Sequence, residues 1–291
     1  MANAEVAIDL MELADLAQPR KIAWEIHRQL RLQFGAVPPQ IPLAAIAAAT
    51  GIVSIEDFET DRFEGTLVIK GDQGAIGLRR GMMPGRRNFT LGHELGHFLN
   101  PWHRRVRQTF ECKRSDTKAQ RTVDFGRKTP LEQIEVEANE FSAALLVPMP
   151  EYRGARRKYG KDADLAHIRA LATTFAVSQE FMGRIYVEQA DEKIALVYSK
   201  NGAISSFVFG EGFPFLGLRR GAPVPATSQT RLAHRRALRG DIEATREVRT
   251  DTWLERRGRV EALFEQVVVQ REGWVTTMLT IEEAEDDGDD E

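Results

Sequence analysis

Residues 86–100 read RRNFTLGHELGHFLN and hold the pattern His-Glu-x-x-His at His93, Glu94 and His97. Apolar residues recur around this pattern at the spacing of a helix, so we predict a helix over residues 89–99. Two residues four positions apart lie on one face of a helix, about one turn from each other. The two imidazoles can therefore bind one tetrahedral zinc ion, and Glu94 then lies beside the open position of that ion.

The residue types of this pattern are those that hydrolysis of a peptide bond requires. Zinc is a Lewis acid that lowers the pKa of a water molecule toward about 7, and Glu94 can take the released proton and pass it to the leaving amine. A chance match is the competing explanation for so short a pattern. The apolar helix around it and the small Gly96, which allows close packing of the backbone, favour a metal site.

A third zinc ligand is needed, and the sequence offers two candidates. Residues 131–147 (LEQIEVEANEFSAALLV) predict a second long helix with one apolar stripe, and Glu135 on this helix can complete the site. Asn139 lies one turn further on, where it can orient a zinc-binding histidine by a hydrogen bond. The alternative is His103, because HELGHFLNPWH has the histidine spacing of the pattern HExxHxxGxxH, with asparagine in place of the glycine. We expect Glu135 to be the ligand. The other acidic residues near it are expected to be solvated charges: Glu132 and Glu137.

The two stretches together, RRNFTLGHELGHFLN and EVEANEFSAALLVP at 135–148, resemble the ImmA/IrrE-type metallopeptidases. The pattern of that family runs R-x-F-T-x-x-H-E-x-x-H and then E-x-x-A-N-x-F-A-A-x-L-L-x-P. The resemblance implies a zinc endopeptidase that acts on bacterial transcriptional repressors. It also implies the site: zinc ligands His93, His97 and Glu135, and general base Glu94. Some members join this domain to a helix-turn-helix segment and a GAF-like sensor domain.

The pattern of elements predicts an α+β fold in several parts. We expect a zincin-like metallopeptidase domain over 1–150, a helical, helix-turn-helix-like segment over 151–190, a C-terminal α+β domain of GAF-like type over 191–281, and an acidic disordered tail over 282–291. Further helices are predicted over 21–34, 43–51 and, as a pair, 164–188. Strands are predicted over 52–58, 65–70, 75–80, 193–199, 203–209, 260–270 and 274–282. We expect the strand AIGLRR at 75–80 to be the sheet edge that receives an extended substrate.

Composition limits the metal ligands, the cellular location and the partners that we expect for this protein. The single cysteine, Cys112, excludes an internal disulfide and a cysteine-rich zinc site, so we expect metal ligands to be His, Asp or Glu. No apolar run is long enough for a membrane span and no basic leader precedes an apolar segment, so a cytoplasmic location is expected. Residues 103–128 are rich in Lys and Arg and predict a solvated loop, a lid or a contact with an acidic partner. Binding of nucleic acid is expected to be weak or absent, although LATTFAVSQEFMGRIYV at 171–187 has the apolar spacing of a helix-turn-helix.

Taken together, these features predict a site-specific zinc endopeptidase that cleaves a cytosolic transcriptional repressor of the helix-turn-helix type. The alternative is a regulator without peptidase activity that keeps the zincin scaffold and docks to a repressor or to DNA. The intact Glu94 favours the enzyme, because a protein that only docks needs no general base.

Overall fold

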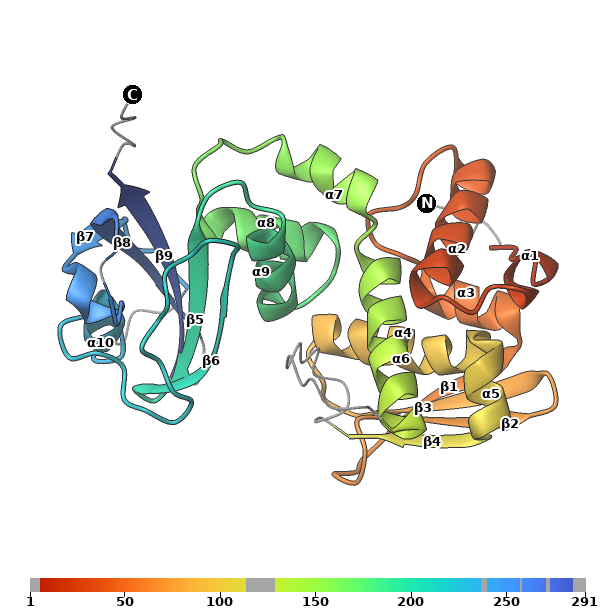
Figure 1. Cartoon of the computed structure of the whole chain (residues 1–291). Coiled ribbons are helices and arrows are strands. Elements are labelled where there is room, and N and C mark those ends of the chain that lie inside the picture. The colour runs from red at the N-terminus through yellow and green to blue at the C-terminus, as the bar shows by residue number, and fades with distance from the viewer. Residues whose placement is uncertain (1–5, 114–128, 237–239, 257, 271–272, 285–291) are drawn as a thin grey trace. The chain divides into compact units, whose positions relative to one another are not determined.

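The computed structural model describes residues 6–113, 129–236, 240–256, 258–270 and 273–284. Part of the predicted basic stretch, at 114–128, and most of the predicted acidic tail, at 285–291, lie outside these residues. The fold is α+β with two sheets (Figure 1). The chain divides into two compact units: a first unit of residues 1–157 and 171–178, and a second unit of residues 158–170 and 179–291.

The first unit contains a four-stranded sheet with the strand order β1-β3-β2-β4. Strands β1 and β3 are parallel, whereas β2 is antiparallel to both β3 and β4. The strands are β1 (Ile52–Phe58), β2 (Gly65–Lys70), β3 (Gln73–Arg79) and β4 (Thr109–Cys112). The expectation that residues 75–80 form the sheet edge is wrong, because β3 is hydrogen-bonded on both sides. Among the described residues, the edges of this sheet are β1 and β4.

Helices of the first unit pack on this sheet and on each other. They are α1 (Met11–Ala14), α2 (Pro19–Phe34), α3 (Leu43–Thr50), α4 (Pro84–Leu99), α5 (Pro101–Val106), α6 (Pro130–Leu146) and α7 (Met149–Arg156). Helix α4 lies against β2 and β3, α6 packs on α4, and α2 packs on α6. The buried side chains between α4 and the sheet are apolar and include Leu67, Ile76, Leu78, Leu91, Leu95 and Phe98. The buried residues of α4 are among the apolar residues whose helical spacing predicted this helix.

Two glycines of α4 allow α6 to approach closely. A Cβ atom at Gly96 would lie 2.8 Å from Cδ1 of Phe141, and a Cβ atom at Gly92 would lie 2.6 Å from Oγ of Ser142. The Ser142 hydroxyl instead donates a hydrogen bond to the carbonyl of Phe89 over 2.8 Å. The close contact of these two helices places side chains of α6 beside the histidines of α4.

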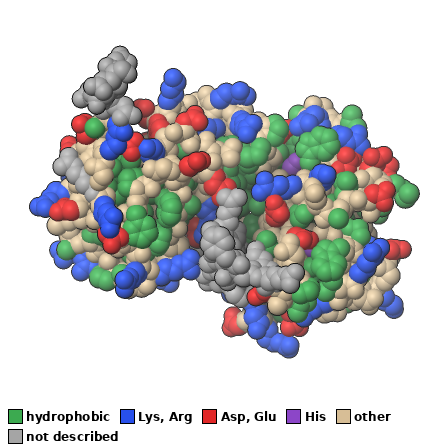
Figure 2. Space-filling view, in the orientation of Figure 1, with side chains coloured by type: hydrophobic (Ala, Val, Ile, Leu, Met, Phe, Trp, Pro, Cys, Tyr) green, Lys and Arg blue, Asp and Glu red, His purple; other side chains and the backbone are tan. Residues whose placement is uncertain are grey.

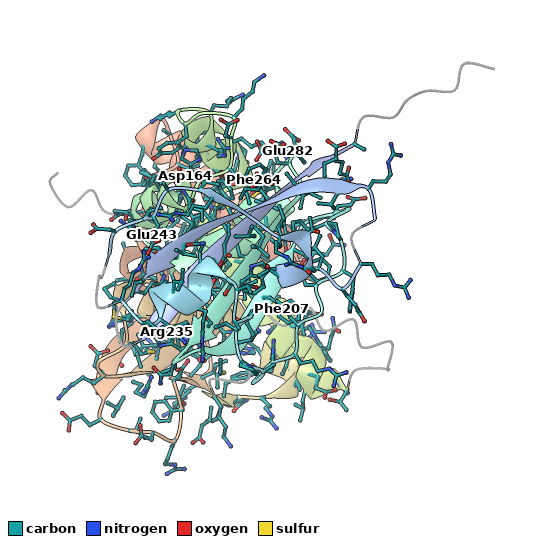
Figure 3. The ribbon with its side chains drawn as sticks, turned by 90° about the vertical axis from the view of Figure 1, so that its left-hand side faces the viewer. Asp164, Phe207, Arg235, Glu243, Phe264 and Glu282 are labelled. Atoms are coloured by element: carbon teal, nitrogen blue, oxygen red, sulfur yellow. The ribbon has the colours of Figure 1, made fainter. Side chains whose placement is uncertain are left out.

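The second unit is built on a five-stranded antiparallel sheet with the order β6-β5-β9-β8-β7. Its strands are β5 (Ile194–Lys200), β6 (Ala203–Phe209), β7 (Arg246–Val248), β8 (Val260–Val269) and β9 (Trp274–Glu283). Helix α9 (Gln179–Glu188) packs on β5 and β6, and α10 (Gln229–Ala233) packs on β8 and β9. Helix α8 (Leu165–Thr174) begins in the second unit and ends in the first, and a short 3-10 helix, η1 (Thr250–Thr252), precedes Trp253. Figure 3 faces this unit, with Phe264 on β8 and Glu282 on β9.

The α+β class and the predicted helices and strands are confirmed, with ends that differ by a few residues. The elements that were not predicted are short, and they include α5, β4, α7, α10 and β7. Within the described ranges, no helix is both long and apolar enough to cross a membrane. On the face seen in Figure 2, positive and negative side chains of the described residues are interspersed.

Candidate metal centre

Two helices and one strand position the group of candidate ligands. His93 and His97 lie one turn apart on α4 and are fully buried. Glu135 lies in the second turn of α6, a helix that begins with a capping box. In that box the hydroxyl of Thr129 accepts from the backbone N–H of Glu132, while the Glu132 carboxylate accepts from the backbone N–H of Thr129. Glu132, which we expected to be a solvated charge, therefore fixes the start of the helix that carries Glu135.

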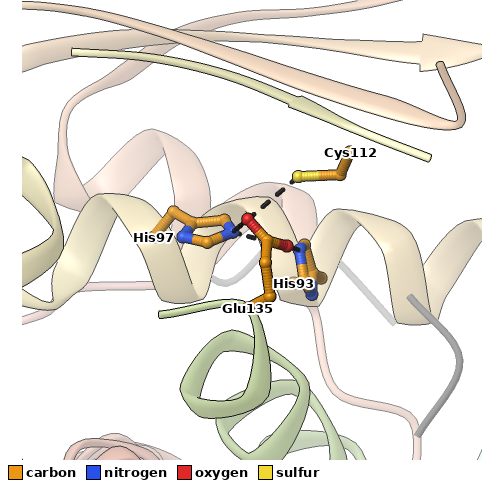
Figure 4. A group of neighbouring side chains, drawn as sticks. All are labelled: His93, His97, Cys112 and Glu135. Carbon is orange, nitrogen blue, oxygen red and sulfur yellow. Dashed lines mark hydrogen bonds and ion pairs between the residues drawn. The ribbon is translucent and has the colours of Figure 1, made fainter. Parts of the chain in front are cut away.

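The side chains of His93, His97 and Glu135 converge on one point, together with Cys112 from β4 (Figure 4). The Nε2 atoms of the two histidines are 3.0 Å apart. Glu135 places Oε2 3.2 Å from Nε2 of His93 and Oε1 3.6 Å from Nε2 of His97. The four ligand atoms of this metal-ligand group all lie within 4.8 Å of one another.

A hydrogen bond from outside the group holds His93. Its Nδ1 lies 3.0 Å from the side-chain oxygen of Asn139, one turn beyond Glu135 on α6. An amide oxygen only accepts, so Nδ1 carries the proton and Nε2 is left with its lone pair directed at the group. Asn139 thus lies beside His93, where it can orient the imidazole as the sequence suggested.

His103 does not point into the metal-ligand group. It lies behind His97, with the two Nδ1 atoms 3.2 Å apart, and its Nε2 lies 3.0 Å from Oε2 of Glu137. Because a carboxylate only accepts, Nε2 of His103 carries a proton and donates it to Glu137. Nδ1 of His103 is then the acceptor, and Nδ1 of His97 donates to it. The expectation that Glu137 is a solvated helix charge is wrong, because its carboxylate also contacts Asn100 and Gln133.

Glu94 is fully buried beside the two histidines. Neither of its carboxylate oxygens makes a hydrogen bond of ordinary geometry within the protein. Burial raises the pKa of Glu94 to about 7, although the charge of His93 and the nearby Cys112 thiol oppose this rise. A carboxyl group held in this way can exchange protons near neutral pH, as a general base requires.

Burial and neighbouring charges shift the pKa values of the three candidate ligands in different directions. Burial lowers the pKa of His97 to about 3, so its imidazole is neutral. Burial also acts to lower the pKa of His93, but Glu135 and Glu94 outweigh it and the pKa is raised. For Glu135, the contacts with both histidines outweigh burial and hold its pKa below the usual range. Neutral imidazole and ionised carboxylate are the forms that bind a metal, so these shifts favour binding at His97 and Glu135, whereas His93 would release a proton as the ion binds.

The group fits zinc on two further observations. With Zn–N bonds of about 2.0–2.1 Å, tetrahedral geometry places neighbouring nitrogen atoms about 3.3 Å apart, close to the separations found between the histidine and Glu135 atoms. Both oxygens of Glu94 are buried and make no hydrogen bond of ordinary geometry. Oε2 of Glu135 is buried 3.2 Å from Nε2 of His93, a nitrogen with no proton to donate when Nδ1 carries it. Such atoms are costly to bury unless something binds them. His93, His97 and Glu135 would hold the ion.

Analysis of the sequence did not identify Cys112 as part of this group. A lone cysteine carries no spacing signal, and we expected the ligands to be His, Asp or Glu. The alternation of Phe110 and Cys112, both buried, with exposed Thr109 and Glu111 is a strand pattern that could have placed the thiol on the inner face.

The geometry is that of an α+β domain in which a histidine pair and a glutamate from two packed helices could hold a metal ion. Residues 53–185 match the model of the IrrE N-terminal-like domain, Peptidase M78. This match confirms the resemblance seen in the motifs: residues 53–185 are similar to the ImmA/IrrE-type family.

Comparisons of the whole chain add little to this. No curated protein matches it in sequence. Among solved structures, a Mycobacterium tuberculosis transcriptional regulator is similar at 16% sequence identity and a TM-score of 0.49, and the alignment covers 94% of this chain and 73% of that one.

Proposed function

We propose that this chain is a zinc-dependent endopeptidase of the zincin type that cuts a transcriptional repressor at one site. The observation that carries the proposal is the convergence of His93, His97 and Glu135 from two packed helices beside a buried Glu94. The match of residues 53–185 to a metallopeptidase family supports the same reading.

Each residue of the site then has a role. His93, His97 and Glu135 hold the ion, which would supply Lewis acidity toward the scissile carbonyl and make a water molecule more acidic. Glu94 takes the proton from the attacking water and returns it to the leaving amine. Asn139 orients His93 through its 3.0 Å contact, and His103 orients His97 through the contact between their Nδ1 atoms.

The edge of the first sheet is a place where a peptide could bind. Strand β4 is an edge among the described residues, and its Phe110 ring stacks on His97 with a centroid separation of 4.2 Å. An extended peptide that added to this edge would pass close to the metal-ligand group. The substrate strand is therefore expected beside β4, rather than beside β3 as the sequence suggested.

The partner is proposed from the resemblance and not from the site. A repressor of the helix-turn-helix type is the expected substrate, and binding of nucleic acid is expected to be weak. The second unit, of the GAF-like sensor type in this proposal, would serve recognition or sensing, and α8 and α9 would be the helix-turn-helix-like pair.

The experiment combines zinc analysis with a cleavage assay. The zinc-loaded chain is mixed with candidate helix-turn-helix repressors, beginning with the product of the neighbouring gene, and products are mapped by mass spectrometry. One product pair that disappears with chelator and with Glu94→Gln supports the proposal. Broad digestion of casein would contradict site specificity, and stable binding of the repressor without cleavage would favour the docking protein.

A further inference from the structure

Cys112 reaches the metal-ligand group from the sheet, opposite the helices. It is the last residue of β4 and pairs with Gly65, the first residue of β2, while its carbonyl accepts from the backbone N–H of Glu64 over 2.9 Å. Its side chain is 1% exposed and points from the strand toward His97 and Glu135 (Figure 4). Backbone pairing of Cys112 with β2 thus fixes the position of the thiol.

Gly65 explains why the thiol comes so close to the ligands. A Cβ atom at this position would collide with the Glu94 carboxylate and would lie 2.6 Å from Cγ2 of Thr90. Because Gly65 has no side chain, β2 can lie close to α4 at this point. Cys112 of β4 pairs with Gly65, so it also lies close to α4. The close contact of β2 with α4 therefore brings both the Phe110 ring and the Cys112 thiol against His97.

The position of the sulfur is that of a fourth ligand. Its Sγ lies 3.8 Å from Nε2 of His97 and within 4.8 Å of the ligand atoms of His93 and Glu135. With bonds of about 2.3 Å to sulfur and about 2.0–2.1 Å to nitrogen, a tetrahedral zinc site separates the two ligand atoms by about 3.6 Å. Three ligands with an open position are typical of catalytic zinc, whereas four protein ligands close the site.

We propose that Cys112 is an inhibitory fourth ligand that keeps the zinc form of this peptidase latent, an inference that rests on the proposed function. When the sulfur binds the ion, the S–H bond is broken and the proton passes to solvent. When the sulfur leaves, it takes up a proton again and the fourth position opens to water and to the scissile carbonyl. The same thiol lies beside Glu94, the proposed general base.

Strand β4 gives the latent state a means of release. Among the described residues it pairs with one strand, over the four residues Gly65–Val68 of β2. A substrate strand or a partner that shifts this edge would withdraw Cys112 without disturbing α4 or α6, which carry the other ligands. Latency and substrate access are therefore linked at one short strand.

The test replaces zinc with cobalt(II) in the full-length chain. Coordination of cobalt by a thiolate gives a charge-transfer band in the near ultraviolet, and Cys112 is the one cysteine of the sequence, so the band has one assignment. We expect the band in the wild-type chain, its loss in Cys112→Ser and Cys112→Ala, and its retention in the matched control Glu94→Gln. We also expect Cys112→Ala to cleave the repressor about tenfold faster or more than the wild-type chain, where tenfold equals about 1.4 kcal/mol.

The outcomes separate this inference from the proposed function. Stoichiometric cobalt binding without a thiolate band in the wild-type chain overturns the fourth ligand and leaves the peptidase proposal standing. A thiolate band together with unchanged or slower cleavage by Cys112→Ala overturns latency. Failure of the wild-type chain to bind cobalt or zinc overturns both. The wild-type spectrum is decisive even where a variant does not fold.

Discussion

Nδ1 of His103 lies 3.2 Å from Nδ1 of His97, on the side of the ring that faces away from the metal-ligand group. His103, which the sequence pattern offers as a third zinc ligand, thus contacts the candidate ligand His97 at the ring nitrogen that does not face the metal-ligand group. Its other nitrogen is bound to Glu137, which completes a chain from a carboxylate to the candidate ligand. Such partners fix the tautomer and orientation of a metal-binding histidine.

The roles of Glu135 and His103 can be separated by metal titration. Glu135→Ala removes a candidate ligand and leaves His93, His97 and Cys112, so it should weaken zinc binding more strongly than His103→Ala does. His103→Ala leaves every candidate ligand in place and should weaken zinc binding about 10–100-fold, because only the orientation of His97 is lost. Competition with a chromophoric chelator measures both affinities. Zinc loss in His103→Ala combined with normal zinc binding in Glu135→Ala would reverse the assignment.

Glu94→Gln should preserve the metal and abolish most of the reaction. The amide has nearly the same shape as the carboxyl group but cannot accept a proton, and general base catalysis contributes about 10²–10⁴ in rate. Zinc content and cleavage rate are measured on the same preparation. Glu140→Gln serves as the control, since it changes a partly exposed carboxylate of α6 that pairs with Arg20. Undiminished cleavage by Glu94→Gln would rule out the proposed base.

Gly96→Ala should destabilise the first unit. The added methyl group would meet the Phe141 ring at 2.8 Å, and overpacking of this kind costs about 1–3 kcal/mol. The matched control is Gly154→Ala on α7, where no atom lies within 4 Å of the added carbon and the helix should gain about 0.5–1 kcal/mol. Thermal unfolding of both variants measures the difference. Equal midpoints would show that the contact of α4 with α6 tolerates a methyl group.

His27 should make the first unit sensitive to acid. Its Nε2 lies 2.9 Å from the carbonyl of Leu145, and burial lowers its pKa from the ordinary value of 6.5. Because the folded state binds the proton less well, its contribution to the free energy of unfolding is intact above pH 6.5 and is lost as the pH falls toward the lowered pKa.

The measurement for His27 is the dependence of unfolding on pH in the wild-type chain and in His27→Gln. The amide of glutamine can still donate to the carbonyl but does not titrate in this range. The difference between the two curves should therefore grow below pH 6.5. Parallel curves across the acid range would contradict the assignment to His27.

The sequence alone determined the helices that carry the site and the register of His93, Glu94 and His97. These features are local: residues four apart share a helix face whatever the rest of the chain does. The apolar stripe of residues 131–147 likewise placed Glu135 and Asn139 one turn apart on a second helix. Recognition of the ImmA/IrrE-type family rests on these same two stretches, and the match of residues 53–185 confirms it.

Only the tertiary structure decided which strand is the sheet edge, what lies behind His97 and what faces the metal-ligand group from above. Strand β4 is four residues long and takes its conformation from pairing with β2, which lies far from it in the sequence. The contact of Glu137 with His103 exists because α6 lies close to α4 and α5. The place of Cys112 depends on the absence of a side chain at Gly65. Each of these relationships joins segments distant in the chain, and periodicity within one segment carries no information about them.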